Sequence, residues 1–218
     1  MAHKAVVVGG SGLIGRLLIQ LLLKSAEYNE VVSLGRKRIS SKNNRLTQHI
    51  VDFNSLESHP DLINGDIIFC CLGSTRKKTP DQDEYQVIDH DYPVKLATIA
   101  HANGASQFHL VSALGADKNS SNFYRRLKGQ TEEDIKAIGL KCLFIYQPSL
   151  LTGHRHEHRP LERIGGVLMA ILNPFLIGRL RKYRSIPGET VAKAMVKQSL
   201  QKKKGVHIYT SDKIKKRT

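Results

Sequence analysis

The chain begins with a short apolar run that leads directly into a glycine-rich turn and then into an amphipathic stretch. Residues 3–8 read HKAVVV, residues 9–15 read GGSGLIG, and leucines recur at helical spacing as far as Leu22. A short apolar run bounded by glycine predicts a buried strand, and apolar residues three and four apart predict a helix. The first residues therefore predict a contiguous strand, turn and helix.

The same alternation continues along the chain. Strands buried on both faces and separated by helices predict a parallel sheet, because a parallel connection needs a crossover that covers one face. We therefore expect an α/β fold of the Rossmann type, a doubly wound parallel sheet with helices on both faces. Further strands are expected at 31–34, 49–52, 66–71, 108–112, 142–146 and 206–209, and further helices at 83–102, 122–138 and 189–202.

The length supports a single domain. The 218 residues are 40% hydrophobic, which is enough apolar material for one α/β core. We expect one domain over 1–218, in which 149–218 form a small C-terminal extension on the substrate side. The three cysteines have neither disulfide-framework nor metal-site spacing, so we expect a reducing, cytoplasmic environment.

Positive charge is concentrated at the C-terminal end. The formal net charge is +15, and the last 40 residues hold 13 Lys and Arg against Glu189 and Asp212. Because few aromatic residues interleave these charges, we expect no nucleic-acid binding. The uncharged stretch 164–178 is too short for a span, but it lies beside the basic run RLRKYR. This pairing fits a hydrophobic substrate lid or a peripheral contact with an anionic membrane.

The glycine turn suggests a phosphate site. Gly9, Gly12 and Gly15 would let the backbone approach a pyrophosphate, and the N–H groups at the helix start would attract its charge. A simple tight turn is the alternative interpretation. Position favours dinucleotide binding, because the turn follows a strand and opens a helix near the start of the chain.

The residues after the second strand indicate which dinucleotide is bound. A carboxylate there would accept from the ribose 2′-hydroxyl of NAD, whereas an arginine would pair with the 2′-phosphate of NADP. The chain has Arg36, Lys37 and Arg38 there, and no acidic residue lies between Glu30 and Asp52. The sequence therefore favours NADP(H) over NAD(H).

Tyr124 and Lys128 are four residues apart on the helix that follows the fifth strand. That spacing places both on one helix face, where an ammonium group favours ionisation of the phenol. Tyr209 and Lys213 have the same spacing, but they lie on and after a late strand. We expect Tyr124 to be the functional tyrosine, because ligands of open parallel sheets bind at the carboxyl ends of the strands.

Several motifs together resemble one known family. Residues 9–15, CLGSTR at 71–76, DHDY at 89–92, VSALGA at 111–116, SNFY at 121–124, QPSLL at 147–151, RHEHRP at 155–160 and SIP at 185–187 are similar to the atypical short-chain dehydrogenase/reductases of the Tat-interacting-protein oxidoreductase type. The resemblance covers nearly the whole chain. It implies an NADP(H)-binding Rossmann domain in which Tyr124 is the acid/base and Lys128 binds the nicotinamide ribose, with contacts from Arg36, Asp52, Ser74, Thr75 and Pro148.

The chain departs from that family at two places. The family usually reads Val-Ser-Ser after the fifth strand, but Ala113 follows Ser112 here, so Ser112 is the nearest remaining hydroxyl. Gln147 stands where the family commonly has arginine, and Ser149 where it has glycine. These departures make cofactor binding the firmer expectation, and catalysis the weaker one.

We expect two further sets to have no catalytic role. His154, His156 and His158 alternate as metal ligands would on a strand, but three arginines within 155–163 disfavour a cation, so no metal is expected. Cys70 and Cys71 should point to opposite faces of a buried strand and serve packing.

The sequence thus predicts an NADPH-dependent oxidoreductase that transfers hydride to a small carbonyl compound. The alternative is a non-catalytic NADP(H)-binding sensor or scaffold whose basic face meets a partner or a membrane surface. Expected catalytic residues are Tyr124, Lys128 and Ser112. Expected cofactor contacts are Gly9, Ser11, Gly12, Leu13, Ile14, Gly15, Arg36, Lys37, Asp52, Phe53, Leu72, Gly73, Ser74, Thr75, Tyr124, Lys128, Pro148 and Leu150.

Overall fold

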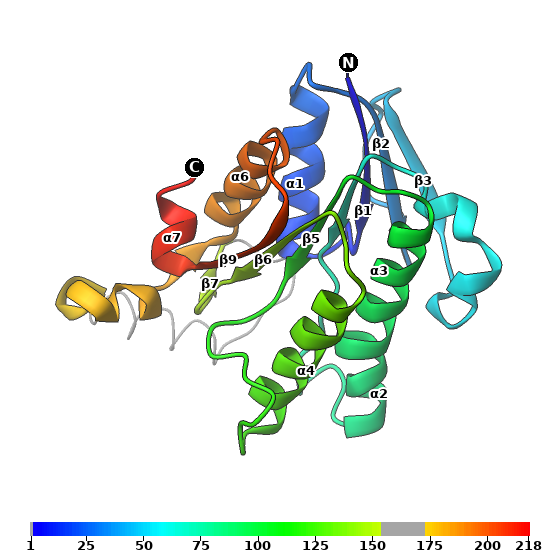
Figure 1. Cartoon of the computed structure of the whole chain (residues 1–218). Coiled ribbons are helices and arrows are strands. Elements are labelled where there is room, and N and C mark those ends of the chain that lie inside the picture. The colour runs from blue at the N-terminus through cyan, green and yellow to red at the C-terminus, as the bar shows by residue number, and fades with distance from the viewer. Residues whose placement is uncertain (1, 154–172) are drawn as a thin grey trace.

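The computed structural model describes residues 2–153 and 173–218 and contains a seven-stranded sheet in which every pair of neighbours is parallel. The strand order is β3-β2-β1-β4-β5-β6-β9 (Figure 1). Two short strands, β7 (Leu151–Thr152) and β8 (Ile186–Pro187), pair separately. The main strands are β1 (His3–Val8), β2 (Tyr28–Gly35), β3 (Leu46–Ile50), β4 (Ile67–Cys70), β5 (Gln107–Val111), β6 (Cys142–Gln147) and β9 (Gly205–Thr210).

Helices cover both faces of this sheet (Figure 1). Helices α1 (Leu13–Lys24) and α6 (Gly188–Ser199) pack together on one face, and α3 (Tyr92–Ala102) and α4 (Phe123–Ala137) pack on the other. Helix α2 (Gln82–Gln86) joins α3 through a π-helical turn, Val87–Asp91, and α7 (Ser211–Lys215) follows β9. The expected Rossmann-type, doubly wound α/β fold is confirmed.

The chain reverses its winding direction between β1 and β4. From β1 it proceeds outward through β2 to β3, and it then crosses back to place β4 on the other side of β1. Connections that leave two adjacent parallel strands in opposite directions open a crevice at the carboxyl ends of those strands, which is where open α/β sheets bind ligands.

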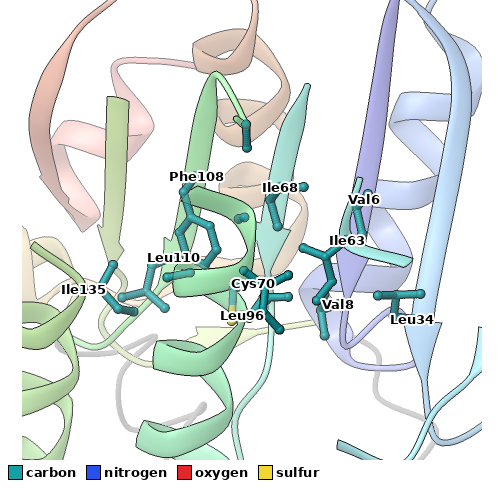
Figure 2. Packing of buried hydrophobic residues seen from close by; sticks show 14 of the residues in the cluster. Val6, Val8, Leu34, Ile63, Ile68, Cys70, Leu96, Phe108, Leu110 and Ile135 are labelled. Carbon is teal, nitrogen blue, oxygen red and sulfur yellow. The ribbon is translucent and has the colours of Figure 1, made fainter. Parts of the chain in front are cut away.

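The central strands are buried on both faces, so each contributes to two apolar layers. One layer contains Val6, Val8, Ile68 and Phe108 from the strands and meets α3 and α4 (Figure 2). The other contains the alternate strand residues and meets α1 and α6. Because successive side chains of a strand point to opposite faces, Cys70 falls in the first layer and Cys71 packs against the second, as expected.

Two parts of the fold differ from the sequence expectations. The third strand is Leu46–Ile50 rather than 49–52. It lies at the sheet edge with one strand neighbour, and its residues are partly buried or exposed, so its apolar signal in the sequence is weak. Beyond residue 149, β9 pairs with β6 along six residues and α6 packs on α1. The C-terminal part therefore completes the main sheet and its helical layer, and α7 was not anticipated.

Candidate functional site

A cavity of about 310 Å³ opens at the carboxyl ends of β1, β4 and β5, at the point where the winding reverses. It brings together the glycine turn, the loop after β4, and the start of α4, which are far apart in the sequence. The residues that line it are Ser11, Gly12, Leu13, Ile14, Arg16, Cys71, Leu72, Gly73, Ser74, Thr75, Lys78, Asp89, Val111, Ser112, Tyr124, Lys128 and Leu151.

The glycine turn is tightly folded against the end of β4. Gly9 has φ +85°, and a Cβ on it would lie 2.7 Å from the carbonyl oxygen of Cys71. A Cβ on Gly15 would overlap the carbonyl oxygen of Gly9. Gly12 caps α1 without any side-chain hydrogen bond, and the first turn of α1 contains no acidic residue. The start of α1 therefore directs N–H groups and positive dipole toward the cavity, which suits a phosphate.

The loop after β4 forms the opposite wall. The Ser74 amide donates to Asp89 Oδ2 at 2.7 Å, and the Ser74 hydroxyl lies 2.6 Å from that of Thr79. The Tyr85 hydroxyl donates to the Ser74 carbonyl at 3.1 Å. Within the described residues, the buried Thr75 Oγ1 has no hydrogen-bond partner. Since buried hydroxyls are normally paired, this atom is suited to a polar group of a bound ligand.

Tyr124 and Lys128 both line the cavity from α4, as predicted. Tyr124 is 40% exposed and contacts the ring of Tyr85 edge to face. Burial of the Tyr124 phenol raises its pKa above the ordinary 10.0, while the Lys128 ammonium lowers that pKa and the Asp89 carboxylate raises it. The expected effect of Lys128 is therefore present, but burial outweighs it and Asp89 acts against it.

Lys128 is buried and carries its charge. Its Nζ lies 2.7 Å from Asp89 Oδ1, and the two side chains are 6% and 1% exposed. Burial acts to lower the pKa of Lys128, but the adjacent Asp89 carboxylate raises it above the ordinary value. The cavity thus contains a buried ion pair, in which each charge offsets the cost of burying the other.

Ser112 lies in the cavity at the end of β5, but its hydroxyl proton is already used. The Ser112 hydroxyl donates to Glu132 Oε1 at 2.5 Å, and Gln147 Nε2 donates to both Glu132 oxygens, at 2.9 and 3.0 Å. Glu132 is 3% exposed, and burial raises its pKa although both hydrogen bonds lower it. Ser112 therefore presents lone pairs, not a proton, to the cavity. Gln147 does not line the cavity, but it is connected to the site by its hydrogen bonds to Glu132.

Helix α4 is held close to the loop that precedes it. A Cβ on Gly129 would overlap the backbone of Asp117 and Lys118, so only glycine permits this approach. The single hydroxyl proton of Thr131 is shared between the carbonyl oxygens of Leu127, at 2.8 Å, and Asp89, at 3.1 Å. Asn122 caps the helix by accepting from the Arg125 amide. These contacts fix the position of α4, and with it the positions of Tyr124 and Lys128 in the cavity wall.

The residues expected to choose the cofactor lie beyond this cavity. Arg36, Lys37 and Arg38 follow β2 and are exposed. Asp52 caps the next turn by accepting from the Asn54 amide at 3.0 Å. Arg38 and Asp52 line a second cavity of about 550 Å³ beside the end of β3. The basic turn 36–38 therefore contacts this second cavity through Arg38.

Other expected contact residues have less access. Phe53 is 4% exposed and packs against the Tyr92 ring, and Pro148 is buried. Neither Pro148 nor Leu150 lines the cavity, whereas Leu151 does. Sequence reasoning missed three charged residues, Arg16, Lys78 and Asp89, that line it. Asp89 had one available signal, because it interrupts the apolar face of its predicted helix.

The remaining candidates are placed as follows. Burial raises the pKa of Cys70 to about 11, so its thiol is protonated near neutral pH. Tyr209 lies on β9, where its hydroxyl donates to Gln198 Oε1 at 3.1 Å. The alternating histidines 154, 156 and 158 fall outside the described residues, as does most of the apolar stretch 164–178.

A family model described as NAD(P)H-binding matches residues 9–202. This chain belongs to that NAD(P)H-binding family. It is 35% identical to Protein HTATIP2 of Rattus norvegicus over 167 residues, covering 74% of this chain and 69% of that protein. It is 36% identical to Protein FMP52, mitochondrial, of Candida glabrata over 203 residues, covering 90% and 85%. The resemblance to atypical short-chain dehydrogenase/reductases is thereby confirmed.

Two solved structures have the same fold as this chain. WbmH of Bordetella bronchiseptica, in complex with NAD⁺, superposes with a TM-score of 0.73 at 17% identity, covering 99% of this chain and 79% of that one. The UDP-glucuronic acid 4-epimerase of Bacillus cereus, in complex with NAD, gives a TM-score of 0.71 at 15% identity, covering 95% and 77%.

The residues present fit an NAD(P)H of this family. The turn at Gly9 and Gly15 leaves no room for side chains at the start of α1, and Thr75 contributes a buried hydroxyl that lacks a partner among the described residues. The compartment stays a prediction, since the FMP52 relatives are named mitochondrial, in contrast to the cytoplasmic expectation. Among the helices of 2–153 and 173–218, none is long and apolar enough to cross a membrane.

The Glu132 network predicts a pH-dependent stability. Because burial raises the pKa of Glu132 above 4.5, the folded chain binds this proton more tightly than the unfolded chain. Stability should therefore fall as the pH rises from the ordinary pKa through the raised one. The Glu132→Gln side chain cannot lose a proton, so the variant avoids the cost of burying a charge. Its Tm at neutral pH should exceed that of the wild type by about 2–4 °C for each kcal/mol gained in the free energy of unfolding.

The matched control is Glu133→Gln on the exposed side of the same helix. Glu133 pairs with Lys136 at 2.8 Å, and that hydrogen bond lowers its pKa, so its replacement should not raise the Tm at neutral pH. Thermal denaturation from pH 4 to pH 8 measures both variants. An equally steep decline in Glu132→Gln and in the wild type would contradict the role assigned to Glu132.

Proposed function

We propose that this chain is an NADPH-dependent oxidoreductase that reduces a small carbonyl compound. The observation that supports this most directly is that residues 11–14 of the glycine turn and the Tyr124–Lys128 pair line one and the same cavity. A bound dinucleotide would extend from the start of α1 toward α4. The family membership makes NAD(P)H the ligand, and the choice of NADPH and of carbonyl chemistry is our proposal.

In this proposal the protein orients the substrate and supplies a proton. The nicotinamide supplies the hydride when the cofactor is bound. Tyr124 donates its phenolic proton to the oxygen of the substrate carbonyl as negative charge develops there. The Lys128 ammonium then stabilises the phenolate, and Asp89 keeps that ammonium protonated and in place.

Ser112 has a narrower role than the sequence suggested. Because its proton is donated to Glu132, its oxygen can accept a hydrogen bond from a ligand but does not polarise a carbonyl while Glu132 is ionised. We therefore place activation of the carbonyl on Tyr124. Ser112 would orient a hydroxyl or an amide N–H of the bound molecules.

Cofactor choice is tested by binding NADPH and NADH in parallel. The basic turn at Arg36 and Lys37 should pair with the 2′-phosphate, and a charge-assisted hydrogen bond of about 1.5–3 kcal/mol corresponds to roughly tenfold to hundredfold in Kd. Arg36→Ala with Lys37→Ala should remove most of the preference. Lys24→Ala, an exposed lysine at the end of α1, is the control. Equal Kd values for the two cofactors in the wild type would contradict the assignment.

The acid is tested with Tyr124→Phe. This variant should bind NADPH as the wild type does, and it should lose about 10²- to 10⁴-fold in kcat, the usual contribution of a positioned acid. NADPH oxidation with a panel of small carbonyl compounds measures it. Tyr183→Phe is the control, because Tyr183 is similarly exposed, at 45%, and does not line the cavity. Full turnover by Tyr124→Phe would refute the role.

The rival function is a non-catalytic NADP(H) sensor. A sensor would bind the cofactor but would not transfer hydride. The observation that favours it is the hydrogen bond from Ser112 to Glu132, because this hydroxyl then has no proton for a substrate carbonyl. A wild-type chain that binds NADPH tightly and oxidises it with no compound of the panel would favour the sensor.

We also propose that the segment around η5 (Gly178–Tyr183) contacts an anionic membrane surface. Phe175, Ile177 and Leu180 are 75%, 64% and 50% exposed, and Arg179, Arg181 and Lys182 lie among them. Apolar side chains next to cations suit the boundary between headgroups and acyl chains.

Sedimentation with vesicles tests this contact. The wild type should sediment with phosphatidylserine-containing vesicles and not with purely zwitterionic ones, and high salt should weaken binding because the cations are exposed. Phe175→Ser with Ile177→Ser should reduce sedimentation severalfold. Val206→Ser removes a comparably exposed apolar residue, 48% exposed on β9, and should not. Equal losses in both variants would overturn the proposal.

A further inference from the structure

The Asp89–Lys128 ion pair is unusual in its position, because it lines the ligand cavity while being almost completely shielded from solvent. Its side chains are 1% and 6% exposed, and Oδ1 and Nζ are 2.7 Å apart. The attraction between opposite charges at this short distance holds the contact. The pair therefore sets the local electrical potential of one cavity wall.

A π-helical turn brings Asp89 to this position. The turn Val87–Asp91 interrupts the helical run between α2 and α3, and such turns place an additional residue within the helix. The neighbouring His90 fixes the turn from the outside, with Nδ1 2.7 Å from Asp91 and Nε2 2.8 Å from Asp134 of α4. The turn is thereby tied to α4 on both its buried and its exposed side.

Three contacts, one from the loop after β4 and two from α4, hold the Asp89 residue in place. Its Oδ2 accepts from the Ser74 amide at 2.7 Å, its carbonyl oxygen accepts from Thr131, and its Oδ1 faces Lys128. The carboxylate cannot turn away from the cavity without losing these contacts. The position of the carboxylate beside Lys128 is consequently a fixed property of the site.

The two redox forms of the cofactor differ by one charge at the nicotinamide ring. The oxidised ring is a cation and the reduced ring is neutral, while the rest of the dinucleotide is unchanged. The ratio of the two affinities therefore depends on the potential near the ring. An unpaired Lys128 would repel the oxidised form, and Asp89 offsets that repulsion.

We propose that Asp89, by neutralising Lys128, sets the relative affinity of this chain for oxidised and reduced cofactor. The inference rests on the proposed function, which brings the nicotinamide beside Tyr124 and Lys128. It assigns to Asp89 a specificity-determining role that is separate from proton transfer. With the pair intact, the oxidised ring meets little net charge from this wall.

The test measures Kd for NADP⁺ and NADPH separately by calorimetry at pH 6.5, because a low pH favours the protonated form of a lysine that has lost its carboxylate partner. In Asp89→Asn the ratio of Kd for NADP⁺ to Kd for NADPH should rise about tenfold, the effect of one uncompensated charge in a shielded site. In Lys128→Met the ratio should fall below the wild-type value. The double variant, without either charge, should return toward the wild-type ratio.

Asp134→Asn is the matched control. It removes a carboxylate that is bound to the same turn through His90, but Asp134 is 55% exposed and does not line the cavity, so the ratio should stay unchanged. If Asp89→Asn is too unstable to purify, Lys128→Met alone tests the inference, which then requires its ratio of Kd for NADP⁺ to Kd for NADPH to be below that of the wild type.

An unchanged ratio in Asp89→Asn or in Lys128→Met, with both nucleotides still bound, would overturn this inference. That outcome differs from failure of the proposed function, which would appear as full turnover by Tyr124→Phe or as no binding of either nucleotide to the wild type.

Discussion

The close approach of the β1–α1 turn to the end of β4 is the constraint on which the rest of this structure depends. Gly9 has a positive φ, and the space that its Cβ would occupy is taken by the carbonyl group of Cys71. Because no side chain separates the two strands at this point, the start of α1 and the loop after β4 become opposite walls of one narrow crevice. Gly12, Tyr124 and Lys128 all line that crevice.

The far end of the crevice is organised by buried charge. Asp89 and Lys128 come from different helices and neutralise each other, and Glu132, one helical turn after Lys128, accepts hydrogen bonds from Ser112 and Gln147. Each buried carboxylate is therefore satisfied by groups from other elements. Such networks are costly when incomplete, so they hold α4, the π-helical turn and the ends of β5 and β6 in one arrangement.

This arrangement alters what the individual residues can do. Tyr124 has a raised pKa, because burial of its phenol outweighs the nearby ammonium and because Asp89 opposes the ammonium. A phenol that retains its proton is suited to act as an acid toward a carbonyl. Ser112 is committed to Glu132 and turns its lone pairs toward the ligand. The cavity is thus lined by one proton donor, Tyr124, and one acceptor, Ser112.

Local pattern by itself determined most of the fold. Short apolar runs such as 3–8 and 142–147, separated by helices with caps like Asn122, specify parallel strands because both the periodicity and the end signals are local properties of the chain. The glycine turn and the Tyr124–Lys128 spacing were visible for the same reason. The predicted start of the edge strand β3 was three residues too late, because apolar and polar positions alternate only weakly in a strand that is partly buried or exposed.

Only the tertiary structure decided which distant groups meet. Asp89 and Lys128 are 39 residues apart, and Ser112 and Gln147 converge on Glu132 from separate strands. No periodicity connects such residues, because their proximity depends on how α4 and the π-helical turn pack over the sheet. The chain alone therefore indicates the glycine turn and the Tyr124–Lys128 pair, whereas the charge balance around them is a product of packing.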